Sequence, residues 1–301
     1  MATRGKSINL FLMDGEPSGS IKCTLANWTG VAYKIPRTEL EKCKERDDLK
    51  QSGVYFLFGV DEETNESVVY VGQAGVRKNG EGILYRLQEH KRKSDKDYWT
   101  EAVVFTTSNN SFGPTEISWL ENRFCSLAAN AKRYSVKNGN DPNLGNVTEE
   151  KESELEEFVD YAKIVMGVLG HKIFEPLTET VSNEKQDDSA VDESIYFFKR
   201  KDTDAKGKTT SEGFVVLEGS VVRMSIRPSC PDSVKSDREK HKNAIGENGI
   251  LNASILFKSP SGASSFVNFG SSNGNIDWKT ANGKTLKDVE NNEAEDVEIN
   301  E

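Results

Sequence analysis

The segments GVYFLFG (residues 53–59) and YVGQ (residues 70–73) are two short apolar runs, each with a tyrosine two residues from a glycine. Tyrosine and valine favour strands, and the polar stretch between the runs predicts a β-hairpin. Side chains alternate along a strand, so Tyr55 and Tyr70 share one face only if paired residue numbers sum to an odd value. A slip of one residue would separate them. The simplest interpretation of the two tyrosines is an ordinary hairpin core.

The surrounding sequence predicts further strands and helices. A hairpin is expected within residues 7–35 and a strand at 101–108, and helices are expected at 36–53, 82–93, 113–134 and 153–170. Thr115 is the expected cap of the third helix. The fold class is therefore α/β, of the α+β type: a three-stranded antiparallel sheet flanked by helices, with the first hairpin and the last helix as additions. A second, smaller α+β domain is expected after it.

The chain of 301 residues is long enough for about two domains. Polar residues without large apolar side chains fill 178–193, which is the best candidate for a linker. The expected organisation is an N-terminal hairpin and helix extension (1–52), a central domain with its C-terminal helix (53–177), the linker (178–193), an accessory domain (194–287) and an acidic disordered tail (288–301).

Composition excludes several classes of protein. The chain is 35% hydrophobic and 29% charged, as expected of a soluble globular protein, and its longest apolar run falls far short of the ~18 residues of a membrane span. No membrane partner or signal peptide is expected. Four scattered cysteines favour a reducing, cytoplasmic location over disulfides or a cysteine-rich zinc site. With only three histidines, no histidine-dominated metal site is expected.

Charge is distributed unevenly along the chain. The net charge is −10, but residues 288–301 hold seven acidic residues and no basic one, whereas residues 77–96 hold seven Lys/Arg against three acids. A local basic patch thus follows the tyrosine hairpin, and it predicts contacts with the DNA backbone. The candidate contacts are Arg77, Lys78, Lys91, Arg92 and Lys93. The alternative is a solvated helix face.

Two helices carry residues suited to phosphate chemistry. Arg86 and His90 are four residues apart, so they share a helix face where the arginine fork could hold a phosphate. Glu121 falls inside an apolar stripe of the helix at 115–131, which costs free energy unless it is paired or binds a cation. It is a candidate Mg²⁺ ligand. The alternatives are an exposed Arg with a surface His, and a Glu121 salt bridge to Arg86 or Arg123.

Taken in order, these residues resemble the GIY-YIG nuclease family. GVY (53–55) and YVG (70–72) match its two signatures with valine in place of isoleucine, Arg86 and His90 in LYRLQEH match its helical arginine and later histidine, and Glu121 in WLENRF matches its metal-binding glutamate. Asn138 or Asn140 in KNGN matches the late asparagine. The resemblance covers about residues 53–141.

This resemblance implies an endonuclease that hydrolyses DNA phosphodiester bonds with a single Mg²⁺ (or Mn²⁺) held by Glu121. Arg86 would then clamp a phosphate oxygen, and Tyr55 would take the proton of the attacking water, which requires a lowered pKa. Tyr70 would position water or phosphate, and His90 would relay the proton. The two tyrosines could exchange roles. A homodimer is a possible arrangement, since cutting both strands often takes two copies.

The C-terminal block also resembles a known family. EGFVVLEGS and NGNIDWKTANGKTL are similar to a small domain of unknown function that often accompanies GIY-YIG domains, which implies an accessory role that could include DNA contact. Trp278 in this block is more simply a core aromatic residue. Two other functions stay open for the whole chain: a catalytically inactive nucleic-acid-binding module, and a structural or protein-interaction role with the acidic surface as the partner-binding face.

Overall fold

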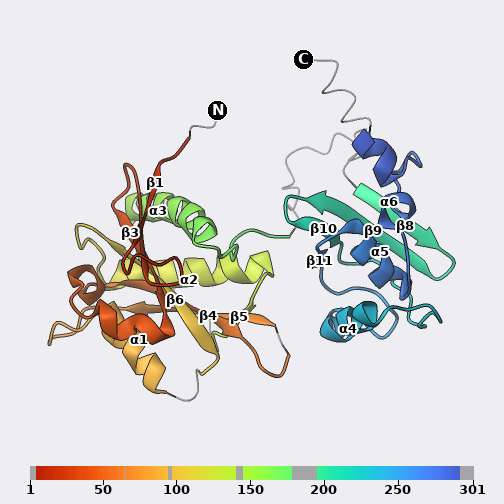
Figure 1. Cartoon of the computed structure of the whole chain (residues 1–301). Helices are drawn as coiled ribbons and strands as arrows, with labels where there is room; N and C mark the ends of the chain where they lie inside the picture. The colour runs from red at the N-terminus through yellow and green to blue at the C-terminus, as the bar shows by residue number, and fades with distance from the viewer. Residues whose placement is uncertain (1–4, 65, 94–96, 140–144, 178–194, 292–301) are drawn as a thin grey trace. The chain divides into compact units, whose positions relative to one another are not determined.

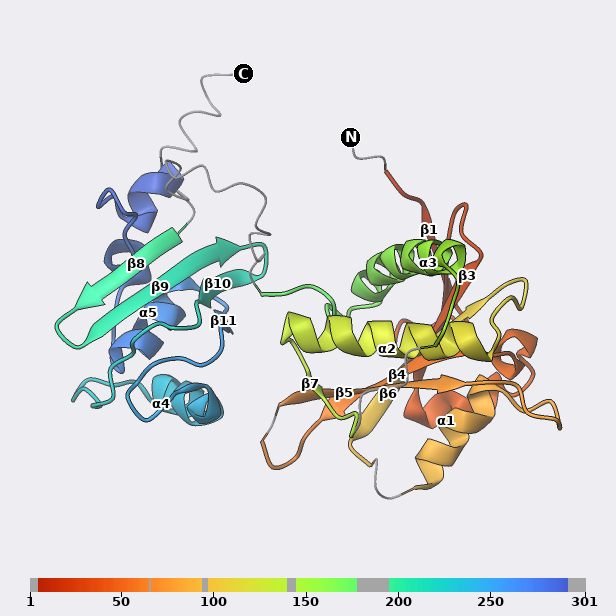
Figure 2. The same cartoon turned by 180° about the vertical axis from the view of Figure 1, so that it is seen from behind.

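The computed structural model describes residues 5–64, 66–93, 97–139, 145–177 and 195–291. The predicted linker at 178–193, Asn140 and the acidic tail from residue 292 onward lie outside these residues. The chain divides into two compact units, residues 1–176 and 177–301. Figures 1 and 2 show the two units from opposite sides, and each is described here by itself.

The first unit is built on a seven-stranded sheet with the order β1-β2-β3-β6-β4-β5-β7. Its neighbouring strands are antiparallel, except that β5 and β7 are parallel. The strands are β1 (Ile8–Leu12), β2 (Ile21–Leu25), β3 (Gly30–Pro36), β4 (Gly53–Val60), β5 (Ser67–Ala74), β6 (Trp99–Thr107) and β7 (Ser135–Val136).

The prediction of a separate three-stranded sheet was therefore wrong in extent. The three expected strands form the β6-β4-β5 part of the seven-stranded sheet. Strand β3 pairs with the other edge of β6 along the whole of Gly30–Pro36. Without β3, that edge would expose a row of unpaired backbone groups. Val31, Tyr33 and Ile35 pack on one face of the sheet and Ala32 on the other, so β3 is buried on both sides. The N-terminal segment is part of the sheet rather than an addition to it.

The β4–β5 register confirms the expected placement of the tyrosines. Tyr55 pairs with Gly72 and Leu57 pairs with Tyr70, so paired numbers sum to an odd value. Tyr55 and Tyr70 are thus diagonal neighbours on one face, at a separation that lets aromatic side chains meet.

Both glycines beside the tyrosines are required by close packing. A Cβ atom on Gly53 would lie 2.2 Å from the backbone oxygen of Phe105 on β6. A Cβ atom on Gly72 would lie 2.4 Å from the Tyr55 hydroxyl oxygen. No side chain fits at such distances, so Gly53 lets the strands pair and Gly72 lets the Tyr55 ring lie across β5.

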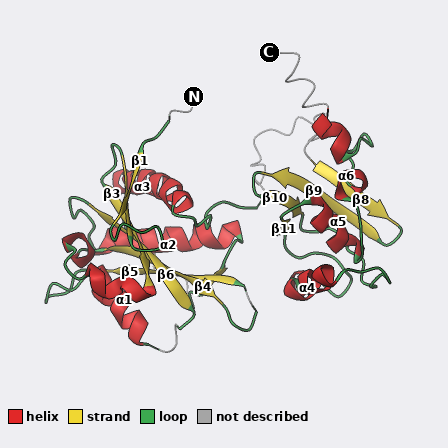
Figure 3. Ribbon diagram, in the orientation of Figure 1, coloured by secondary structure: helices red, strands yellow, loops and turns green. Residues whose placement is uncertain are grey.

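Three of the four predicted helices are α-helices. They are α1 (Ile83–Arg92), α2 (Pro114–Ala131) and α3 (Glu149–Val168) (Figure 3). Helix α2 is capped at Gly113 rather than Thr115, because the Glu116 carboxylate accepts a hydrogen bond from the Gly113 N–H at 3.1 Å. Helix α3 begins earlier than expected, at the Thr148 cap.

The predicted helix at 36–53 is instead two 3₁₀ helices, η1 (Arg37–Cys43) and η2 (Asp47–Lys50). Leu40, Cys43 and Leu49 are the buried side chains of this segment. Their separations are multiples of three, which matches three residues per turn rather than 3.6.

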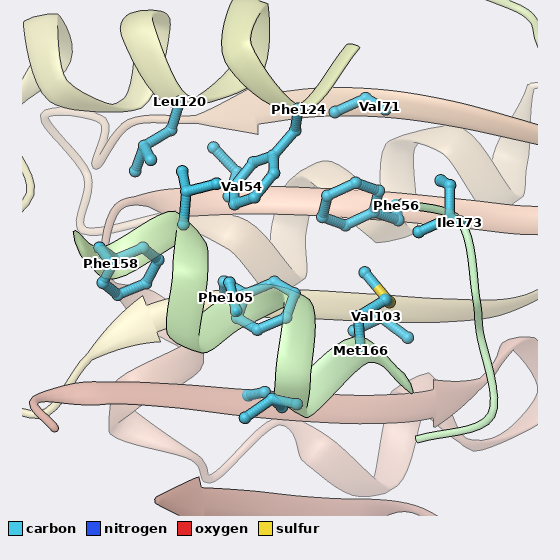
Figure 4. Close-up of a cluster of buried hydrophobic side chains, with 14 of the residues drawn as sticks. Val54, Phe56, Val71, Val103, Phe105, Leu120, Phe124, Phe158, Met166 and Ile173 are labelled. Carbon is cyan, nitrogen blue, oxygen red and sulfur yellow. The ribbon is translucent and has the colours of Figure 1, made fainter. Parts of the chain in front are cut away.

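The two faces of the large sheet carry different layers. Helix α1 covers one face, and helices α2 and α3 cover the other (Figures 1 and 2). On the α2 and α3 face, Phe56, Phe105 and Phe124 form an aromatic centre (Figure 4). On the α1 face, Tyr55 packs among Leu57, Leu84, Leu87 and other apolar side chains.

The second unit is a smaller α+β domain with a four-stranded antiparallel sheet in the order β11-β10-β9-β8. Trp278 is fully buried in its core, and its indole N–H donates to the Pro260 carbonyl at 3.0 Å. The elements are β8 (Ile195–Arg200), β9 (Thr203–Thr210), β10 (Gly213–Val216), α4 (Asp232–Lys240), η4 (Lys242–Ala244), β11 (Ile255–Phe257), α5 (Pro260–Asn268) and α6 (Gly274–Asp277).

The predicted start of the disordered tail at residue 288 was too early. Residues 286–291 are helical, and Leu286 is buried in the core of the second unit, where Val289 also packs. These two apolar side chains hold the segment in place, although it lies within an acidic stretch.

Two expectations from composition can be compared with the structure. All four cysteines are free thiols, and Cys23, Cys43 and Cys125 are buried. Across the described residues, no helix is both long enough and apolar enough to cross a membrane.

Candidate functional site

Tyr55, Tyr70 and His90 form an aromatic cluster between the β4–β5 hairpin and α1. The Tyr55 hydroxyl lies 2.7 Å from His90 Nε2. The ring of Tyr70 is 6.3 Å from that of Tyr55 and 5.6 Å from that of His90, measured between centroids. Tyr55 and His90 are only 1% and 2% exposed, whereas Tyr70 is half-buried. Tyr70 is thus the member of the cluster that solvent reaches most easily.

The electrostatics of the tyrosines differ from the prediction. We expected a lowered pKa for Tyr55, but burial raises it, Tyr70 raises it further, and the Arg86 cation only partly opposes this. Burial and then the Glu121 carboxylate also raise the pKa of Tyr70. The prediction failed because it counted the nearby positive charge and omitted the cost of ionising a phenol out of contact with water. Both hydroxyls therefore keep their protons near neutral pH.

Arg86 is oriented by Glu89, a residue that the sequence reasoning missed. Glu89 accepts from Arg86 at 2.7 Å and from Arg77 at 3.0 Å, and the two cations lower its pKa to about 2, with Arg77 the larger cause. Arg77 also lies over the Tyr85 ring at 4.8 Å. The i,i+3 spacing of Arg86 and Glu89 was the signal that could have identified this pair.

Glu121 approaches the tyrosines from α2, which packs beside β5 on the opposite face of the sheet from α1. It is half-buried, and its charge contributes to the raised pKa of both Tyr55 and Tyr70. Arg86 forms an ion pair with Glu89, and Arg123 forms one with Glu156. The structure thus brings Glu121 into the neighbourhood of the other predicted residues.

The residues around Glu121 fit one kind of metal better than others. Within the described part of the chain, no group of three or more His, Cys, Asp or Glu side chains is arranged to hold a metal ion. Mg²⁺ commonly takes one or two carboxylates and keeps several waters, whereas zinc needs a fuller set of protein ligands. A half-buried carboxylate such as Glu121 is a type of ligand that Mg²⁺ or Mn²⁺ accepts.

Asn138 lies beside the site, but its amide group is engaged with the backbone. Its Nδ2 donates to the Val71 carbonyl at 2.8 Å, and its Oδ1 accepts from the Val71 N–H at 3.0 Å. Strand β7 pairs with β5 only at Val68 and Val69, so Asn138 extends that pairing by one step. This is a structural role at the sheet edge, and the expected contact with DNA is not needed to explain the residue.

The candidate DNA-binding cations lie at the two ends of α1. Arg77 and exposed Lys78 precede it, while half-buried Lys91 and exposed Arg92 and Lys93 are at its C-terminal end. The Arg77 side chain nevertheless reaches the C-terminal part of α1, where it pairs with Glu89 at 2.9 Å. The positive charge of Lys91, Arg92 and Lys93 at the C-terminal end of α1 also complements the helix dipole.

Comparison with known proteins identifies part of the second unit. Residues 196–290 match the family described as a domain of unknown function (DUF4357). No curated protein and no solved structure matches the chain. The expected resemblance of the C-terminal block to a domain of unknown function is thus confirmed, and none of these findings bears on residues 53–141.

Proposed function

We propose that the first unit is a Mg²⁺-dependent endonuclease that hydrolyses DNA phosphodiester bonds and belongs with the GIY-YIG nucleases. The observation that carries the proposal is the convergence of five residues from β4, β5, α1 and α2. Tyr55 and His90 are hydrogen-bonded at 2.7 Å, and Arg86 and Glu121 both act electrostatically on the two tyrosines. A fold built for stability alone has no need of this combination of a cation, a carboxylate and two phenols near one another.

Arg86 would bind a non-bridging oxygen of the scissile phosphate. Its guanidinium is permanently charged and planar, and Glu89 fixes its direction. Arg86 is about one-third exposed, so a phosphate could approach its outer nitrogen atoms. Fixed positive charge at the phosphate stabilises the transition state without a reorganisation cost.

The tyrosines and His90 would move the proton of the attacking water. Tyr70 would receive this proton as it passes its own to Tyr55, and Tyr55 would pass its proton to His90 Nε2. Each hydroxyl gains one proton as it loses another, so no buried phenolate forms and the raised pKa values are no obstacle. The proton ends on the His90 imidazole, because an imidazole can carry a proton on both of its ring nitrogens.

Glu121 would hold the divalent cation. When bound there, Mg²⁺ or Mn²⁺ would supply charge neutralisation at the phosphate and at the departing 3′ oxygen. The half-buried position limits the number of waters around the carboxylate and so strengthens its attraction for a cation.

A catalytically inactive nucleic-acid-binding module is the second candidate. It is favoured by one observation, namely that Arg86 is already paired with Glu89 while Tyr55 is almost completely buried. Such a site could bind a phosphate without activating water. The two functions differ in whether bound DNA is cut.

Cleavage of a supercoiled plasmid in Mg²⁺ tests the proposal. Glu121→Gln removes the cation ligand, so we expect at least a hundredfold loss of cleavage. Glu116→Gln makes the same charge change on the same helix, and glutamine can still accept the Gly113 cap bond, so this control should cut normally. Nicked product is consistent with one copy acting alone, and linear product with a homodimer.

Two results would contradict the nuclease. Persistent cleavage by Glu121→Gln would remove the assigned cation site. Binding of the plasmid without cleavage in either Mg²⁺ or Mn²⁺ would favour the inactive module.

A further inference from the structure

A groove with a volume of about 600 Å³ runs beside β8 in the second unit. One wall is β8 itself, and the other is the segment 276–283. The side chains that matter most are Phe197, Lys199 and Arg200 from the strand, and Ile276, Asp277 and Lys279 from the segment. This volume is within the usual range for ligand pockets.

The groove exists because β8 is an edge strand and its aromatic residues alternate. Tyr196 and Phe198 point into the core, whereas Phe197 lies on the other side of the strand and remains partly exposed. Segment 276–283 meets β8 at one pair, Phe197 and Lys279, through backbone bonds of 2.7 and 3.0 Å. A single backbone pair leaves an open channel on either side, with an aromatic ring at its wall.

Positive charge dominates the groove. Asp277 is neutralised by Arg200 at 2.8 Å. The Lys199 ammonium lies 5.5 Å from the centroid of the Phe197 ring, and Lys206 on β9 is paired directly opposite Phe197. Among the described ion pairs, none involves Lys279. Lys199 also pairs with Asp204 at 3.9 Å, whereas none of the described ion pairs involves Lys206.

The charge of the whole second unit also favours an anionic ligand. Residues 195–291 hold fifteen Lys/Arg and eleven Asp/Glu, although the entire chain has a net charge of −10. The two segments around the groove, 195–209 and 276–287, hold eight Lys/Arg and three Asp/Glu. An anionic ligand is therefore favoured here and disfavoured over most of the remaining chain.

We propose that this groove binds single-stranded nucleic acid. A base would stack on the Phe197 ring, and the neighbouring phosphates would lie against Lys199, Lys206 and Lys279. Aromatic side chains that bear a stacked base, combined with cations that follow the backbone, are the general means of holding single strands. A duplex is disfavoured because its bases are already stacked on each other and cannot present a face to Phe197.

This inference goes beyond the proposed nuclease, since it concerns a different unit and needs no catalysis. It gives the domain of unknown function a ligand class. It also allows a chain whose net charge is negative to contact a polyanion at a defined place.

Binding of a fluorescein-labelled 20-nucleotide oligothymidine to the full chain, followed by anisotropy in EDTA, tests the proposal. Phe197→Leu keeps an apolar side chain but removes the stacking face, so we expect affinity to fall about fivefold or more. Lys279→Gln should weaken binding and reduce the slope of log affinity against log salt by about 0.7. The control Lys240→Gln changes the same charge on exposed α4, away from the groove, and should bind like the wild type.

Unlabelled oligothymidine and oligouridine as competitors distinguish DNA from RNA as the source of the single strand. Unchanged affinity of Phe197→Leu, with circular dichroism showing a folded domain, would overturn the proposal. An equal loss in Lys240→Gln and Lys279→Gln would also overturn it, because the effect would then be one of overall charge.

The nuclease and the groove fail independently. If plasmid cleavage is absent but oligonucleotide binding still depends on Phe197, only the nuclease proposal fails. If binding does not depend on Phe197 but cleavage still depends on Glu121, only the groove proposal fails.

Discussion

Adjacent residues of β4 serve the two faces of the large sheet in different ways. Val54 and Phe56 point towards α2 and α3, where Phe56 meets Phe105 and Phe124 with ring centroids 6.0 and 5.3 Å apart. Tyr55 points towards α1 and bonds to His90. Strand alternation thus separates the residues that stabilise the fold from those proposed to supply chemistry, within three consecutive positions.

The two faces should respond differently to substitution. An apolar face loses free energy when a side chain is shortened, because contacts and burial disappear together. A polar cluster loses less stability when one hydroxyl is removed, but it loses its capacity to move protons.

The largest effect on stability is expected at the centre of the apolar face. Phe124 is fully buried and has three aromatic neighbours, so Phe124→Ala should lower the free energy of unfolding by about 3–5 kcal/mol. Urea unfolding measures this loss. The control Phe11→Ala, at a position 54% exposed on β1, should change it by less than about 0.5 kcal/mol. Equal losses would remove the distinction between core and surface.

The next effect is expected at Gly72, which pairs with Tyr55 on the α1 face. A Cβ atom there would collide with the Tyr55 hydroxyl, so Gly72→Ala should cost about 1–3 kcal/mol and displace the ring from His90. Cleavage should fall more than stability. The control is Gly139→Ala, because a Cβ atom at Gly139 has open space and should change neither stability nor cleavage. Gly80→Ala is less suitable because Gly80 has a positive φ, which strains an alanine. A Gly72→Ala protein with normal cleavage would contradict the need for this packing.

A smaller effect is expected at the edge of β5. Asn138→Ala removes two hydrogen bonds to Val71 and should lower the free energy of unfolding by about 1–2 kcal/mol. Hydrogen exchange of the Val71 amide should become faster. If exchange is unchanged but DNA affinity drops, the residue contacts DNA and the structural role is wrong.

The smallest effect concerns acid stability. The pKa of Glu89 is lowered to about 2, so its ion pairs stabilise the fold fully above the ordinary value near 4.5 and are lost as pH falls towards 2. Since Glu89 is partly exposed, the contribution should be less than about 1 kcal/mol. Urea unfolding at pH 3 and pH 7 should show a smaller pH dependence in Glu89→Gln than in the wild type. The exposed control Glu62→Gln should keep the wild-type dependence, and an unchanged dependence in Glu89→Gln would contradict the assignment.

Sequence patterns could predict whatever depends on local periodicity. Helices α1, α2 and α3 follow from the helical repeat, and strand alternation gave the condition that the β4–β5 register meets when it puts Tyr55 and Tyr70 on one face. Pairing of β3 with β6 could not be predicted, because it joins segments about 70 residues apart through generic backbone bonds.

The electrostatics of the site could not be predicted from the sequence either. The pKa direction of Tyr55 depends on how completely other elements bury it, which no local pattern records. Asn138 illustrates the same limit, since its role is set by the distance from its amide to a neighbouring strand. Phe197 was not singled out because only the placement of 276–283 beside it creates a groove.

The most direct test compares two neighbouring residues on opposite faces. Tyr55→Phe and Phe56→Leu would be assayed for plasmid cleavage in Mg²⁺ at a temperature where both are folded, with stability measured in parallel. We predict that Tyr55→Phe loses cleavage by about a hundredfold or more with little loss of stability, while Phe56→Leu loses stability and retains cleavage. Cleavage by Tyr55→Phe at the wild-type rate would contradict the assignment of chemistry to the α1 face.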